Sequence, residues 1–419
     1  MMQAIITGDL MLHRIWLGFF VVAFISALYQ WLGLGDAEVF QRMVTALFDM
    51  AGLSVELAIG LVGLMALWLG IVAVGEASGL IGKLAHLLSP LFTRLMPEVP
   101  AGHPAISSMT LNLSANILGL DNAATPLGIK AMKDLQLLNP TPEVASNAQI
   151  LFLVLNTSAV TLFPVTILLY RAQLGATDPA AVFIPILIAT SCSTLAGLLV
   201  TAWVQRIKLA DGVVLAFLGG AFALLLALVG WFATLSATEL QHQSSLVSNL
   251  LIISLVMLFL LVAHRRKVNV YDTFIEGARQ GFETAIGIIP YLLAMLVAIG
   301  VFRASGAMDV VMGGLRDLVA LGGWDTRWVD AMPTGLMKPL SGSGARAMMI
   351  DTMNTFGVDS FQGRLAATMQ GSTETTFYVL AVYFGAVGIR HSRHAVACGL
   401  VADLAGITAA IVVAYWFYG

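Results

Sequence analysis

The sequence is poor in charge and in cysteine. Only 11% of its 419 residues are Asp, Glu, Lys or Arg, against about 25% in soluble domains. Because 58% of the residues are hydrophobic, we predict an all-α polytopic membrane protein. A net charge of −3 gives no electrostatic basis for binding nucleic acid. The two cysteines, Cys192 and Cys398, lie in apolar runs without metal-ligand spacing, so we interpret them as packing residues.

Motifs of catalysis and metal binding are missing as well. The sequence has no HExxH motif, no recognisable pair of catalytic carboxylates and no Ser/His/Asp arrangement. Most histidines lie near predicted helix ends and loops, where solvated or capping roles are favoured over metal ligation. We therefore expect no enzyme, no metal site and no cofactor, with a sodium ion as the one candidate ligand of that kind.

Apolar runs of about 20 residues predict nine membrane crossings. They lie at 15–32, 53–74, 147–170, 181–205, 212–235, 246–264, 284–302, 362–388 and 395–417. Basic residues follow the runs at 181–205 and 246–264, which favours a cytoplasmic position for both loops. Counting from these loops predicts a bacterial inner (plasma) membrane protein with a cytoplasmic N-terminus and an extracytoplasmic C-terminus.

One polar motif occurs twice inside these apolar runs. Residues 156–165 and 370–379 share an amide, Ser, Thr, Phe and Val at the same offsets. Each copy follows an amphipathic helix, a span, an amphipathic segment (79–94 or 305–320) and a polar hairpin. Chance similarity between apolar helices is the alternative, but it explains poorly why polar residues also align.

The repeat divides the chain into four parts. We predict an N-terminal transmembrane helix at 1–36, a first repeat at 37–208, two linking helices at 209–267 and a second repeat at 268–419. If each hairpin enters and leaves on one side, the second repeat starts after an odd number of crossings. The two repeats are then inverted, a plan found in secondary transporters.

The first polar hairpin is expected between residues 112 and 130. Thr125 and Pro126 predict a helix start, with Thr as cap and Pro in the first turn. Polar groups in this otherwise apolar stretch come from Asn112, Ser114, Asn116 and Asn122. We interpret the stretch as a re-entrant helix-turn-helix, and an ordinary surface loop with a capped helix is the alternative.

The second hairpin is expected between residues 338 and 346. Ser341 or Ser343 can cap the helix that follows, and free backbone amides there favour an anion. Lys338 and Arg346 add positive charge to this site. The alternative is that both long side chains extend to the membrane interface.

The doubled motif itself predicts two interrupted spans. Pro164 follows the first copy and can kink its helix. In the second copy, Gln370 and Glu374 are four residues apart and are expected on one helical face. Glu374 is interpreted as a proton carrier, a sodium ligand or a counter-charge for solute, since an acid at membrane depth is costly. A structural pair with Arg346 or Lys338 is the alternative.

These motifs supply the candidate site. Predicted solute-binding residues are Asn112, Ser114, Asn116, Asn122, Thr125, Asn156, Thr157, Ser158, Ser341, Ser343, Gln370, Ser372, Thr373 and Glu374. Candidates for ion coupling are Glu374, Asn156, Thr161 and Thr375. Ser and Thr in these spans can alternatively bond only to neighbouring helices.

Several of these stretches resemble known families. Residues 119–132 resemble spore maturation protein A, while residues 302–306, 369–376 and 382–390 resemble spore maturation protein B. The chain looks like the two proteins fused. Both families carry the gate, or nucleoside-recognition, domain, which is similar to parts of concentrative nucleoside transporters and of ferrous iron transporter B. The resemblance implies a concentrative-nucleoside-transporter-like fold with two hairpins and two unwound helices. The family often has Asp at the position of Glu374.

The leading hypothesis is a secondary transporter of a small polar or anionic solute, driven by sodium or protons. A non-transporting membrane scaffold or sensor with a degenerate site is the second hypothesis, and a channel is the third. Expected partners are a small-molecule solute and the lipid bilayer, and a homo-oligomer is left open.

Overall fold

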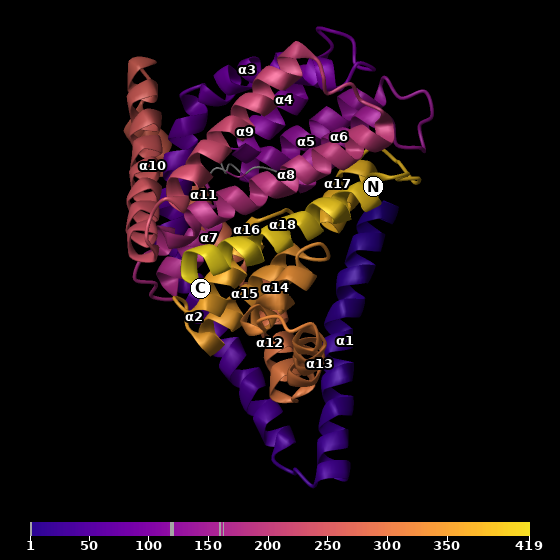
Figure 1. Cartoon of the computed structure of the whole chain (residues 1–419), viewed down its shortest axis with the longest axis vertical. Coiled ribbons are helices and arrows are strands. Elements are labelled where there is room, and N and C mark those ends of the chain that lie inside the picture. Colours follow the sequence, from indigo (N-terminus) through magenta and orange to yellow (C-terminus); the bar gives the residue numbers. More distant parts are fainter. Residues whose placement is uncertain (1, 118–120, 159–160, 162) are drawn as a thin grey trace.

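The computed structural model is almost entirely helical (Figure 1). It describes residues 2–117, 121–158, 161 and 163–419, with the side chains of 2–13, 121–123 and 237 excepted. Within these residues the chain forms helices α1 to α18 and two short 3-10 helices, η1 and η2.

Seven helical segments of the described chain are long and apolar enough to cross a membrane. They are α1 (Met2–Leu34), α2 (Val39–Ala77), η1 (Pro179–Val182) with α8 (Phe183–Gln205), α9 (Gly212–Ala233), α10 (Ala237–Arg265), α11 (Val270–Gly287) with α12 (Ile289–Ala304), and α18 (Ala395–Tyr418). Large apolar side chains such as Phe24 and Leu224 point away from the protein, as a lipid environment requires. The chain is a polytopic membrane protein.

The two predicted spans that carry the polar motif are broken, as expected. The first consists of α6 (Asn147–Thr157) and α7 (Val165–Gln173), and the second of α16 (Phe361–Gly371) and α17 (Thr376–Gly385). Pro164 stands immediately before α7, and its ring nitrogen cannot donate the bond that would continue a helix. The nine expected crossings therefore become seven continuous segments and two pairs of half-helices.

A helical hairpin precedes each broken helix. In the first half α3 (Leu80–Leu95) leads to α4 (Pro104–Ile117) and α5 (Asp121–Gln136). In the second half α13 (Ala307–Leu321) leads to η2 (Arg327–Ala331), α14 (Met332–Met337) and α15 (Gly342–Phe356). Gly79 and Gly306 precede α3 and α13 with φ of 69° and 70°, a backbone conformation that favours glycine. Both amphipathic segments are thus confirmed, and the same order of elements occurs in both halves.

Two predicted helix boundaries are wrong. α5 begins at Asp121, so Thr125 is not its cap and Pro126 lies inside the helix. The backbone bond that Pro126 cannot make is a local cost, and this turn is instead tied to α4 by Asn112, whose Nδ2 donates to Ala124 O at 2.7 Å. The expected amphipathic helix before 53–74 is continuous with that span in α2, whereas Pro290 starts a separate helix, α12, in the second half.

Equivalent helices of the two halves pack against each other. α8 and α18 run side by side through the centre of the molecule, and α2 packs on α11 and α12 (Figure 1). The contact of α2 with α11 depends on Gly277 and Gly281. A Cβ atom on Gly281 would lie 2.5 Å from Ala66 Cα, and one on Gly277 would lie 2.5 Å from Leu69 O. Small residues of this kind allow close helix contact where lipid provides no hydrophobic driving force.

Two loop contacts join the broken helices at their outer ends. Before α6, Glu143 O accepts from the backbone N of Arg390 and of His391, at 2.9 and 3.0 Å. Before α16, Asp359 Oδ2 accepts from Thr177 N at 2.8 Å, and buried Arg171 bonds the same loop. Burial alone would raise the pKa of the Asp359 carboxyl, but bonds from Thr177 and the charge of Arg171 lower it. We call these contacts the 143–391 clip and the 177–359 clip.

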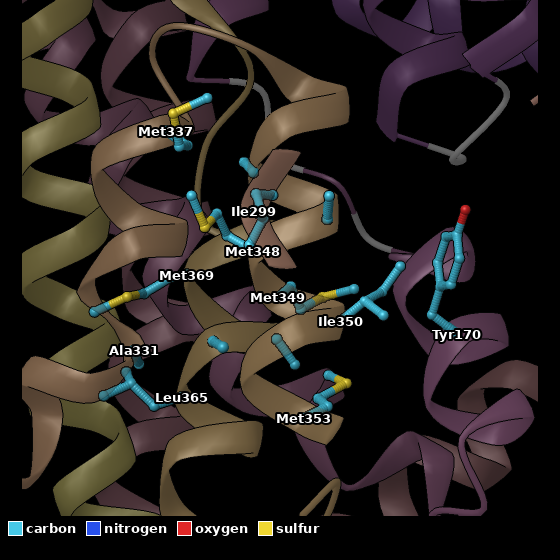
Figure 2. Close-up of a cluster of buried hydrophobic side chains, with 14 of the residues drawn as sticks. Tyr170, Ile299, Ala331, Met337, Met348, Met349, Ile350, Met353, Leu365 and Met369 are labelled. Atoms are coloured by element: carbon cyan, nitrogen blue, oxygen red, sulfur yellow. The ribbon is translucent and has the colours of Figure 1, made fainter. Parts of the chain in front are cut away.

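The largest buried cluster is rich in methionine (Figure 2). Met348, Met349 and Met353 of α15 lie with Met337 and Met369 between α12, α14 and α16. Methionine fills irregular gaps between helices that do not pack in regular register. The second hairpin is therefore held by apolar packing alone on this side, which leaves its polar tip free to face the site.

The α2–α11 contact gives a test of this packing. We expect Gly281→Ala to lower the unfolding temperature in detergent and destabilise the protein by about 1–3 kcal/mol, because backbone atoms must move apart. Gly287→Ala is the matched control on the same helix, since a Cβ there meets no atom within 4 Å. Equal melting temperatures for the two variants would contradict the packing described here.

Candidate functional site

A cavity of about 650 Å³ lies where the hairpins and the helix breaks meet. Nine of its lining residues belong to the site predicted from the sequence: Asn116, Thr125, Asn156, Thr161, Ser341, Ser343, Gln370, Glu374 and Thr375. Both hairpins and both breaks contribute to this set. Residues that are up to about 260 positions apart in the chain therefore share one pocket.

The two breaks contact each other directly. Glu374 N donates to Thr157 O at 2.7 Å, and Thr373 Oγ1 lies 3.0 Å from the same oxygen. Phe377 N donates to Pro339 O at 3.0 Å, which ties the second break to the second hairpin. These backbone groups have lost their helical partners, and buried N–H and C=O groups need a replacement. The predicted approach of 156–161 to 370–375 is confirmed.

An amide network orders one wall of the cavity. Asn156 Oδ1 accepts from Asn116 Nδ2 at 2.8 Å and from Tyr383 OH at 3.1 Å. Behind them, Asn112 Nδ2 lies 3.3 Å from Tyr383 OH. Asn156 Nδ2 donates to Phe152 O in its own helix. Asn156 is therefore held in one orientation, and Asn112 acts from the buried side of the wall.

The other wall carries charge. Ser341 caps α15 as predicted and accepts from Gly344 N at 3.1 Å. Lys338 Nζ lies 3.9 Å from Glu374 Oε2, which matches the alternative of a structural pair. The Arg346 guanidinium lies 5.7 Å from the ring centre of Tyr170 and forms no ion pair with any described residue. The lining thus contains two cations and one anion.

Two expectations about charged residues are wrong. Glu374 is not deeply buried, because its side chain is 48% exposed to the cavity. It also does not share a helical face with Gln370, since α16 ends at Gly371 and Glu374 lies in the break. Lys338 does not extend to an interface, because its side chain is only 4% exposed.

Other predicted site residues serve the framework. The hydroxyls of Ser114, Ser158 and Ser372 donate to carbonyls of their own helices, at 2.6, 2.8 and 2.9 Å. Thr157 and Thr373 are buried at the contact of the two breaks. The side chain of Asn122 lies outside the described part of the chain.

Sequence reasoning missed two groups of residues. Aromatic side chains line the cavity at Tyr170, Tyr291, Phe377, Tyr378 and Tyr383. In the sequence they are indistinguishable from core or interface residues. Asp403 was also missed: it is a fully buried acid in α18 that accepts from Thr373 and Thr376. Its signal was available, because it is the one acidic residue in the apolar run 395–417.

Comparison with known proteins agrees with this arrangement. The profile of the Gate family, described as nucleoside recognition, matches residues 58–173 and 285–390. The chain belongs to the Gate family. The two matched segments include both hairpins and both helix breaks. The resemblance to gate-domain proteins that the sequence indicates is confirmed.

Two Bacillus subtilis (strain 168) proteins are similar to this chain. Spore maturation protein B is 47% identical over 154 residues, which cover 37% of this chain and 85% of that protein. Spore maturation protein A is 33% identical over 190 residues, which cover 45% of this chain and 93% of that protein. No solved structure shows a significant match.

The amide wall predicts the effect of one hydroxyl. We expect Tyr383→Phe to destabilise the protein by about 1–3 kcal/mol, because Asn156 and Asn112 lose a buried partner. Thermal unfolding in detergent measures this loss. Tyr378→Phe is the matched control, since Tyr378 lines the same cavity and is 56% exposed. A Tyr383→Phe variant as stable as the control would contradict the network.

Proposed function

We propose that this Gate-family protein is a secondary transporter of a small polar or anionic solute, coupled to sodium or protons. The observation that carries the proposal is the cavity enclosed by two hairpins and two helix breaks. Its volume of about 650 Å³ is in the range of small-molecule sites, roughly 300–1,000 Å³. Polar backbone at membrane depth is tolerable only when protein or water covers it, and such breaks are typical of transporters.

The solute's chemistry follows from the lining. Gln370 Oε1 and Tyr170 OH are buried polar atoms without a hydrogen-bond partner among the described residues, and both residues line the cavity. Native structures rarely leave such atoms unpaired, so a ligand or water is expected to complete them. The unpaired Arg346 favours an anion or an electron-rich group. The tyrosines offer flat faces to an unsaturated or apolar part of the solute.

The transport cycle would use the internal repeat. We propose that 37–208 and 268–419 are inverted repeats with a concentrative-nucleoside-transporter-like arrangement. The same order of elements in both halves and the packing of α8 on α18 support this proposal. Rocking of one half against the other around a fixed site would then expose the cavity to each side in turn.

Orientation is part of the same proposal. Arg206 and Lys208 follow α8, and Arg265 to Lys267 follow α10, so both loops are placed in the cytoplasm of a bacterial inner membrane. The N-terminus would then be cytoplasmic and the C-terminus extracytoplasmic.

A non-transporting scaffold or sensor is the second candidate, because Lys338 and Glu374 already neutralise each other within the cavity. Uptake by proteoliposomes distinguishes the candidates. A carrier accumulates solute against a gradient when an ion gradient is imposed. A channel only equilibrates the solute and gives currents in bilayers, and a scaffold does neither.

The first prediction for uptake concerns Arg346. We expect Arg346→Gln to lower the uptake of an anionic solute at least about tenfold, because the free positive charge of the cavity is lost. Arg346→Lys should retain part of the activity. Arg279→Gln is the control, since Arg279 is exposed on α11 outside the cavity. Wild-type uptake of every transported anion by Arg346→Gln would exclude this role.

The second prediction concerns Glu374. We expect Glu374→Gln to abolish coupled uptake, because the buried Lys338 ammonium is left without its counter-charge. Uptake is measured with sodium or proton gradients of either direction. Unchanged kinetics and unchanged ion dependence would rule out a role for this carboxylate in the cycle.

A further inference from the structure

Asp403 carries a charge that no neighbouring cation balances. It lies in the membrane-crossing helix α18 and is 1% exposed. Its carboxylate accepts two hydroxyl bonds, from Thr373 Oγ1 at 2.5 Å and from Thr376 Oγ1 at 2.6 Å. Asp403 forms no ion pair with any residue that the structure describes. A buried carboxylate is costly unless a positive charge accompanies it.

The surroundings of Asp403 contain more acceptors than donors. The single proton of the Thr373 hydroxyl has three oxygens in reach: Asp403 Oδ1, Thr157 O at 3.0 Å and Glu374 O at 3.3 Å. Thr157 Oγ1 is buried and has no hydrogen-bond partner in the described part of the chain. Clustered oxygens short of protons are the environment that a hard cation prefers.

The helix breaks aim negative potential at this cluster. Thr157 is the last residue of α6, so its carbonyl belongs to the negative end of a helix dipole. Thr373 lies in the second break, and Thr376 is the first residue of α17. Half-helix C-termini and unwound carbonyls are groups that coordinate sodium in transporters built on broken helices.

α18 is shaped to let the breaks approach. Gly399 and Gly406 lie four and three residues from Asp403, on the same face of the helix. A Cβ atom on Gly399 would lie 2.8 Å from Thr376 Cγ2 and 3.6 Å from Thr157 Cγ2. A Cβ atom on Gly406 would lie 2.9 Å from Ser372 O. The second break therefore reaches Asp403 only because these two positions lack side chains.

We propose that Asp403, Thr157 O, Thr373 Oγ1 and Thr376 Oγ1 form a sodium site. The two hydroxyls turn their protons outward when the ion enters, so that their lone pairs face it. The site is separate from the solute cavity, because none of these four residues lines it. Lys338 and Glu374 act on Asp403 electrostatically with opposite signs. Only the role of the ion in coupling rests on the proposed transport function; its binding does not.

Thermal unfolding of the purified full chain tests the site without any solute. The melting temperature is recorded while sodium chloride replaces choline chloride at constant ionic strength, with potassium chloride in parallel. We expect a saturable sodium-specific rise of a few degrees for the wild type, because a ligand that binds only the folded state stabilises it. Asp403→Asn should abolish the rise.

Further variants keep the test decisive if Asp403→Asn does not fold. Thr376→Val should raise the sodium concentration at half-effect about tenfold or more, whereas Thr376→Ser should keep the wild-type value. Glu374→Gln should also keep the sodium response. The proposal is overturned if potassium and choline act like sodium, or if Thr376→Val responds as the wild type does. It is also overturned if only Glu374→Gln loses the response, or if Asp403 changes stability with pH but not with sodium. A normal sodium response without solute uptake would leave the site intact and reject the transport function instead.

Discussion

The need of unpaired backbone groups for partners determines how this protein is built. Each broken helix leaves amides and carbonyls without helical partners, in a part of the chain where water cannot be relied on. The second break solves this with groups from elsewhere: Glu374 N bonds Thr157 O, and Phe377 N bonds Pro339 O. Neither break is stable alone, because each completes the other. The position of the cavity follows from that dependence, since it lies where the breaks and hairpins converge.

Charge is divided between two places with different surroundings. Glu374 lies at the cavity beside Lys338 and is half exposed, so its cost is shared with a counter-charge and with whatever fills the cavity. Asp403 lies on the opposite side of the Thr373 hydroxyl and is closed off from the cavity. Thr373 touches both the first break and Asp403. A change of charge at Asp403 therefore acts on the bond that joins the two halves.

Much of the fold was predictable because membrane helices are specified by local composition. Apolar length gives the seven continuous segments, and Pro164 gives the first break. The second break has no proline; it depends on bonds to Thr157 and Pro339, which lie far away in the sequence. This is why Gln370 and Glu374 were placed on one helical face. The start of α5 was misplaced for a related reason, since Asn112 holds Ala124 from another helix.

The candidate site was predicted in outline but not in its division of roles. Polar type alone cannot separate Asn156, which faces the cavity, from Ser158, whose hydroxyl bonds to its own helix. Tyr383 and Asp403 were missed because an aromatic residue in an apolar run is usually core. A lone acid in the last helix was likewise overshadowed by the repeated motif. The two clips have a mechanical consequence. With the 143–391 clip at one end, the 177–359 clip at the other and the Thr157–Glu374 bond between them, the four half-helices form a cross-braced frame. Such a frame resists shear between its members, so any displacement that opens the cavity is borne by the helices that attach to it from outside.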